Sequence, residues 1–157
     1  MSKLTLTLED LKDHIGKEVG VTDWFTIDQR AEDVFSFLIG DPDEKHNDPE
    51  WSKNGPFGGT VVHGYFQLSL TTEAWKKLGL PLATTADFTP VNYGLNRVRF
   101  PSPLRVGQRA RCRVAIDDVT ERHDGSYLVK TTFTMEAEGS EKPCLVAQKL
   151  YLFLRLK

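Results

Sequence analysis

A period of two in apolar positions runs along three segments in the second half of the chain. Between residues 109 and 117 every second residue is apolar, and the same period of two returns at 127–138 and 145–156. This period is typical of an antiparallel strand with one apolar face. We therefore predict three strands, with Asp124-Gly125 as a hairpin turn between the first two. Residues 91–100 indicate one more strand before them.

A period of 3.6 residues replaces this alternation in the first half. Asp28 can cap a helix whose apolar positions share one face, namely Ala31, Val34, Phe35 and Leu38. Residues 61–78 form the longest segment with the character of a buried helix, and Gly79 and Pro81 end it. Upstream, residues 8–15 predict a short helix and residues 20–27 a strand.

One long apolar helix followed by long antiparallel strands with a single apolar face predicts an α+β fold. The sheet is expected to curl around the helix, and a two-layer sandwich with helices flat on one sheet is the alternative. A chain of 157 residues is expected to form one domain with its own core. It contains no repeats, linkers or low-complexity tracts.

Charge and cysteine content narrow the classes of function. The 20 Lys and Arg residues nearly balance the 22 Asp and Glu residues, so no basic excess indicates a nucleic-acid partner. Cys112 and Cys144 have no Cys or His neighbours at metal-site spacing and are expected to be buried thiols. Neither a signal-peptide core in the first thirty residues nor a membrane-length apolar run is visible. We expect a cytoplasmic protein that acts on a small molecule.

Two short motifs carry the candidate chemistry. Asp41 and His46 lie five residues apart on one Pro-bounded loop, and a Gly-rich turn then leads through His63-Gly64 into the apolar helical segment. A carboxylate and an imidazole on one loop can address one water molecule, and the turn can aim a free backbone N–H at a developing negative charge. The pair of motifs suggests hydration chemistry.

Each of these residues also has a structural interpretation. Asp41 could cap the chain as an ordinary turn carboxylate, and His46 could be an exposed loop imidazole. His63, at the start of an apolar helix, is expected from its position alone to be a hydrogen-bonded structural histidine. A calcium loop is disfavoured by Lys45, a phosphate loop by the missing Gly-Lys-Ser/Thr, and a zinc site on Asp41, His46 and His63 by their spacing.

The segments Gly40-Asp41-x4-His46-x-Asp48-Pro49 and Gly-Pro-Phe-Gly-Gly-Thr-Val-Val-His63-Gly64 together resemble the MaoC-like family of (R)-specific enoyl-CoA hydratases, which have the hotdog fold. The resemblance runs from about residue 22 to the C-terminus. It implies one hotdog domain over residues 1–157, with residues 1–18 as an N-terminal helical extension. Residues 91–101 resemble a branch of the family that includes nodulation protein N homologues.

By this resemblance, Asp41 and His46 are the catalytic pair, Gly64 supplies the oxyanion-binding N–H, and His63 and Tyr65 accompany it in binding substrate. This chain departs from the family motif at Asp43-Glu44, where the family has Asn-Pro. The implied reaction is reversible hydration of trans-2-enoyl-CoA to (R)-3-hydroxyacyl-CoA by a homodimer. It needs no metal or redox cofactor, and coenzyme A enters only as part of the substrate.

Arginine side chains on the strand at residues 91–100 and just beyond it add a candidate contact. Arg97, Arg99 and Arg105 could bind the phosphates of coenzyme A. The alternative, which is commoner for arginines on a strand, is that they only form a solvent-exposed charged face. Two alternative functions stay open. A hotdog thioesterase would hydrolyse the thioester with the same loop carboxylate, and a binding module would keep the fold with a degraded site, which Asp43-Glu44 favours.

Overall fold

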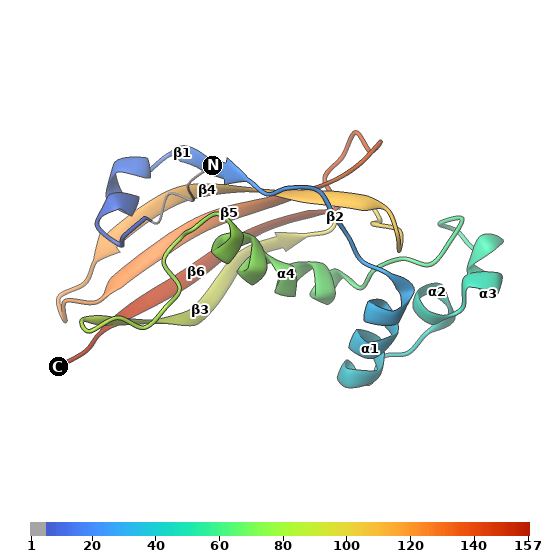
Figure 1. Ribbon diagram of the computed structural model, residues 1–157, viewed down its shortest axis with the longest axis horizontal. Coiled ribbons are helices and arrows are strands. Elements are labelled where there is room, and N and C mark those ends of the chain that lie inside the picture. Colours follow the sequence, from blue (N-terminus) through green and yellow to red (C-terminus); the bar gives the residue numbers. More distant parts are fainter. Residues whose placement is uncertain (1–5) are drawn as a thin grey trace.

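The computed structural model describes residues 6–157, so the first five residues of the expected N-terminal extension lie outside the described part. One antiparallel sheet with the strand order β1-β4-β5-β6-β3 dominates it, and β2 pairs with β4 (Figure 1). In chain order the elements are η1 (Asp10–His14), β1 (Lys17–Val21), β2 (Phe25–Thr26), α1 (Gln29–Ile39), α2 (Glu44–Asn47), α3 (Pro49–Lys53), α4 (Gly64–Lys77), β3 (Phe88–Arg99), β4 (Arg109–Glu121), β5 (Tyr127–Ala137) and β6 (Leu145–Arg155).

The predicted α+β architecture is confirmed. Figure 1 shows α4 lying along the curved sheet, with α1, α2 and α3 gathered beyond one end of it. Trp75 of α4 is fully buried, and its ring centroid lies 4.7 Å from that of Tyr151 and 6.2 Å from that of Phe133. Burying one such aromatic side chain contributes at least about 1.5–3 kcal/mol, so these rings fix the helix on the sheet.

The alternating segments form the strands that their pattern predicts. In β5 the residues from Tyr127 to Ala137 alternate between buried and half-buried positions, and β4 buries Cys112 with its apolar neighbours. Cys112 and Cys144 are both fully buried free thiols, as expected. The hairpin at Gly125 is also confirmed, since Arg122 and Ser126 are joined across it by a backbone hydrogen bond of 2.8 Å.

Two predicted segments differ from the structure in detail. The strand expected at 20–27 is divided into β1 and β2, with three residues between them outside any strand. The short helix expected at 8–15 is the 3-10 helix η1, which spans only Asp10–His14. In both cases the type of local structure is near the prediction, and the length is shorter.

Helix α1 begins where predicted, but only part of its apolar face reaches the core, through Ala31 and through Phe35, which stacks on Phe66. Val34 is 56% exposed and Leu38 is 79% exposed, whereas Glu32 and Ser36 are fully buried. The predicted apolar stripe is therefore only partly buried, since Ala31 and Phe35 are half-buried. The helix packs toward α2 through polar groups that form hydrogen bonds there, so its face toward α2 is the polar one. Among residues 6–157, no helix combines the length and apolar character needed to span a membrane.

Candidate active site

The end of α1 places Asp41. Gly40 has a φ of +73°, a left-handed conformation that suits glycine, and its N–H reaches the carbonyl of Phe37 at 3.3 Å. The next N–H, that of Asp41, donates to the carbonyl of Ser36 at 2.9 Å. These bonds fix the Asp41 backbone directly beyond the helix end, and its side chain stays 66% exposed. A carboxylate in this position is held by its backbone and open to a ligand.

His46 lies on the short helix α2 and not, as predicted, on one loop with Asp41. Asp43 caps this helix by accepting a hydrogen bond of 3.0 Å from the N–H of Lys45. His46 is only 6% exposed, and its Nδ1 lies 2.6 Å from the carbonyl of Val61. Since a carbonyl only accepts, Nδ1 carries the proton and Nε2 is the free acceptor of a neutral ring. Burial lowers the pKa of His46 below 6.5, which favours that neutral form.

His63 joins the two motifs. It is the N-cap residue of α4, and its ring stacks on that of His46 with centroids 3.5 Å apart. Its Nε2 lies 3.2 Å from the Asp41 carbonyl and 3.4 Å from Asp41 Oδ2, and its Nδ1 forms a close hydrogen bond with Glu32. The ring therefore links a buried carboxylate to the exposed one. His63 is therefore a hydrogen-bonded structural histidine, as expected, and it also contacts Asp41 directly.

Glu32 is a member of the site that the sequence motifs do not reveal. Its side chain is fully inaccessible, and its two carboxylate oxygens lie 3.2 and 3.3 Å from the backbone N–H of His63. The nearer oxygen also lies 3.7 Å from His46 Nδ1. A signal exists in retrospect, because Glu32 and Ser36 recur at helical spacing as a polar stripe on a helix that is otherwise rich in apolar residues.

A second set of polar contacts joins α1 to α2. Gln29 Nε2 donates to the carbonyl of His46 at 2.7 Å, and Asn47 Nδ2 donates to Asp33 Oδ1 at 2.8 Å and to Ser36 Oγ at 2.7 Å. These bonds connect residues 11 to 17 positions apart in the chain. They hold the helix that carries His46 against the helix that carries Glu32, so the distance between His46 and Glu32 is fixed.

The N-terminus of α4 opens at the same place. Gly64 is its first residue, and the Gly64 N–H has no hydrogen-bond acceptor among residues 6–157. A Cβ at this position would lie 2.9 Å from the ring of Phe100, so the glycine permits a close approach. Free N–H groups and the helix dipole favour negative charge here. Tyr65 follows on the helix with its side chain 69% exposed and outside the histidine cluster.

The three candidate arginines lie in two separate places. Arg97 on β3 lines a hollow of about 600 Å³ with residues of β5 and β6, and Arg99 on the same strand is exposed. Arg105 instead lines a pocket of about 450 Å³ together with Lys53 and Thr60. Thr60 immediately precedes Val61, which receives the His46 hydrogen bond. Of the three, Arg105 is therefore the one beside the histidine cluster.

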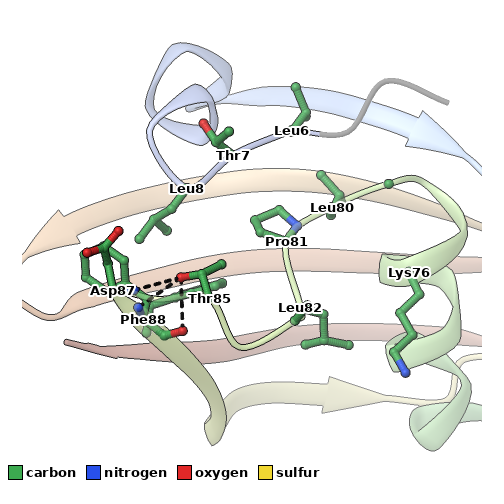
Figure 2. Close-up of a pocket in the computed structure, with 13 residues that line it drawn as sticks. Leu6, Thr7, Leu8, Lys76, Leu80, Pro81, Leu82, Thr85, Asp87 and Phe88 are labelled. Carbon is green, nitrogen blue, oxygen red and sulfur yellow. Dashed lines mark hydrogen bonds between the residues drawn. The ribbon is translucent and has the colours of Figure 1, made fainter. Parts of the chain in front are cut away.

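A more apolar pocket of about 680 Å³ lies at the other end of α4. Figure 2 shows Leu6, Leu8, Leu80 and Leu82 around it, with Phe88 at its edge. The pocket contains none of the candidate residues. From Gly64 to its lining residue Lys76 the helix rises about 18 Å, since each residue adds about 1.5 Å. Its lining contains no histidine, and the candidate acid–base residues Asp41, His46 and His63 lie at the α1 end of the molecule.

Three buried side chains could hold a metal ion. Glu32, His46 and His63 offer ligand atoms that all lie within 4.8 Å of one another. Carboxylate and imidazole are ordinary zinc ligands. In this structure Nδ1 of each histidine already forms a hydrogen bond, one with Val61 and one with Glu32. A metal ion bound through the two Nδ1 atoms would have to replace both of these hydrogen bonds. Metal removal therefore tests the prediction that the chemistry needs no metal.

Comparison with known proteins places the chain in a family. Residues 10–138 match the family model described as "MaoC like domain". The chain belongs to this MaoC-like family. Over 152 residues it is 36% identical to 3-hydroxyacyl-thioester dehydratase Z of Mycobacterium tuberculosis, covering 94% of this chain and 96% of that protein. Over 145 residues it is 37% identical to nodulation protein N of Rhizobium leguminosarum bv. viciae, covering 90% and 88% of the two chains.

Solved structures agree on the fold. The monoamine oxidase regulatory protein from Archaeoglobus aligns with a TM-score of 0.76 at 19% identity, covering 97% of this chain and 95% of that one. The (R)-hydratase from A. caviae aligns with a TM-score of 0.70 at 17% identity, covering 87% and 94%. The predicted hotdog fold is confirmed, and so is the resemblance to MaoC-like proteins that include nodulation protein N.

Proposed function

We propose that this MaoC-like protein catalyses the reversible hydration of trans-2-enoyl-CoA to (R)-3-hydroxyacyl-CoA. The supporting observation is the convergence of Asp41, His46 and His63 at the open N-terminus of α4, where the Gly64 N–H has no acceptor within the described residues 6–157. The reaction requires a base for water, an acid for the α-carbon and a donor for the enolate-like oxygen. A group of a suitable type is present for each requirement.

In the proposed mechanism Asp41 removes a proton from water as its oxygen attacks carbon 3 of the enoyl group. His46 accepts a hydrogen bond from the same water at Nε2 and orients it, and the protonated Asp41 carboxyl then gives its proton to carbon 2, which restores the carboxylate. The Gly64 N–H holds the thioester oxygen while negative charge develops there, assisted by the dipole of α4. His63 contributes as a positioning residue, because it touches Asp41 on one side and Glu32 on the other.

The departure from the family motif has a structural explanation that is compatible with activity. Asp43 caps α2 through the N–H of Lys45, and Glu44 is exposed in the first turn of that helix. An aspartate cap and an acidic first turn both stabilise a helix N-terminus. Asp43-Glu44 therefore supports the helix that carries His46, which weakens the argument for a degraded site.

The proposed active unit is a homodimer. Strand β3 lies at the edge of the sheet and exposes Val91, Tyr93 and Leu95, at 37%, 54% and 47%. On α1, Phe37 is 67% exposed and Leu38 is 79% exposed. A long edge strand and an apolar stripe of this kind are normally covered by a partner. A sizing column should show activity in the dimer fraction, and full activity in a strictly monomeric fraction would contradict this part.

Incubation with crotonyl-CoA tests the proposed function. Loss of enoyl absorbance without release of free thiol is expected for a hydratase. Thiol release would indicate a thioesterase, and neither change would indicate a binding module. The stereochemistry is tested by adding an (S)-specific hydroxyacyl-CoA dehydrogenase to the product, which should oxidise little of it. Efficient oxidation by that enzyme would contradict the proposed (R) configuration.

A further inference from the structure

Lys149 on β6 is a buried cation that the proposed mechanism does not use. It lies on the core side of the strand and is only 8% exposed. Its Nζ donates to Thr72 Oγ1 at 2.9 Å and lies 4.6 Å from the ring centroid of Tyr151. No carboxylate among residues 6–157 forms an ion pair with Lys149. A buried ammonium with one neutral hydrogen bond and no counter-ion is costly and needs an explanation.

A cavity gives Lys149 access to a ligand. It has a volume of about 400 Å³, and its wall consists of one side of α4, the middle of β3 and Lys149. Hydroxyl and amide groups of Ser69, Thr72 and Asn92 also line it. Asp41, His46 and His63 are not among its lining residues. The cavity is therefore a place of its own, separate from the catalytic cluster.

Helix α4 connects this cavity with the proposed catalytic cluster. Gly64 and Thr72 are eight residues apart on it, which corresponds to about 12 Å along the axis. At about 100° per residue the two positions differ by about 80°, so they lie on the same side of the helix. A molecule whose thioester oxygen sits at Gly64 and whose chain follows α4 would reach Lys149. An extended chain advances about 1.2 Å per bond, so about ten bonds span this distance.

We propose that the cavity receives the far end of the acyl chain and that Lys149 selects substrates ending in a carboxylate. This inference rests on the proposed hydration reaction and names its substrate class as enoyl-CoA derivatives of dicarboxylic acids with about ten carbons. A terminal carboxylate would supply the missing counter-ion. It would also accept from the two remaining Nζ protons and from Asn92. An apolar terminus would leave the Lys149 ammonium unpaired.

Two substrates of equal length test this inference. We would compare kcat/KM for the ten-carbon trans-2-enedioyl-CoA, which has a free terminal carboxylate, with kcat/KM for trans-2-decenoyl-CoA. The native protein should prefer the carboxylate substrate by about tenfold to 100-fold, the range of a hydrogen-bonded charged pair. Lys149→Met should abolish or reverse the preference, and Lys149→Arg should restore part of it.

A matched variant controls for general loss of charge. Lys130 lies on β5 between Val129 and Thr131, which are both fully buried, so its side chain is on the opposite face of the sheet. Lys130→Met should keep the native preference. The inference is wrong if the native protein hydrates both ten-carbon substrates equally or prefers the uncharged one. The proposed hydration itself fails only if crotonyl-CoA and both long substrates remain unchanged, so the two failures are distinguishable.

Discussion

Replacing Glu32 with glutamine tests whether the buried network organises the site. Glutamine has the same shape as glutamate but replaces one acceptor oxygen with a donor group. In the native protein both carboxylate oxygens face donors on His63, namely its backbone N–H and its Nδ1. Glu32 is fully buried, so water cannot replace a lost partner. The amide can serve one of these donors and must face another with its own N–H.

The expected cost follows from this mismatch. Loss of one hydrogen bond to a charged group costs about 1.5–3 kcal/mol. Removing one partner of a buried charged pair costs about 3–5 kcal/mol. We therefore expect Glu32→Gln to lower the free energy of unfolding by about 2–4 kcal/mol. Because His63 also contacts Asp41, kcat/KM should fall by about 10-fold to 100-fold through misplacement of that carboxylate.

Urea denaturation at pH 7 and crotonyl-CoA hydration measure the two effects. Glu44→Gln is the matched control, because Glu44 is an exposed glutamate on the neighbouring helix α2. The control should stay within about 0.5 kcal/mol of the native protein. If Glu32→Gln is as stable as Glu44→Gln and hydrates crotonyl-CoA at the native rate, then the Glu32–His63 pair does not organise the site.

Three further predictions concern the oxyanion donor, the histidine pKa and a metal. Gly64→Ala and Gly64→Pro both place a Cβ against Phe100, but only proline removes the N–H. The value of kcat should therefore be about 10²–10³-fold lower for the proline variant than for the alanine variant. Equal rates would show that the oxyanion donor is another group. Burial lowers the pKa of His46, so just below pH 6.5 the unfolded state binds more protons than the native state. The free energy of unfolding of the native protein should therefore fall from pH 7 to pH 5, and it should fall less for His46→Gln. Urea denaturation at each pH measures both, and parallel stability curves for the two proteins would refute this. Dialysis against a chelator should leave kcat unchanged, and a loss restored by zinc would show that Glu32, His46 and His63 bind a metal.

The strands and the end of α1 could be predicted from sequence because both are local. The alternation along β4 and β5 reports directly on which side of each strand is buried. The end of α1 at Gly40 is likewise set by a cap that involves neighbouring residues. Periodicity does not report which surface covers an apolar stripe. It therefore could not predict that α1 exposes Val34 and Leu38 and buries Glu32.

Long-range contacts account for the rest of what was missed. The Glu32–His63 hydrogen bond joins residues 31 positions apart, and the stacked rings of His46 and His63 are 17 residues apart. Neither contact has a local sequence signal. On β6 the leucines alternate with Lys149 and Tyr151, and the structure turns Lys149 and Tyr151 inward. A lysine on the core face is the opposite of what apolar patterning indicates, and here it borders a cavity.

The most direct test of the central claim is the effect of Asp41→Asn on crotonyl-CoA hydration. Asp43→Asn is its matched control, because Asp43 is a second aspartate on the same loop and asparagine also caps helices well. We expect Asp41→Asn to lower kcat about 100-fold or more with an unchanged urea midpoint, as for a positioned acid–base group, and Asp43→Asn to retain nearly native turnover. Near-native turnover by a folded Asp41→Asn protein would contradict the account.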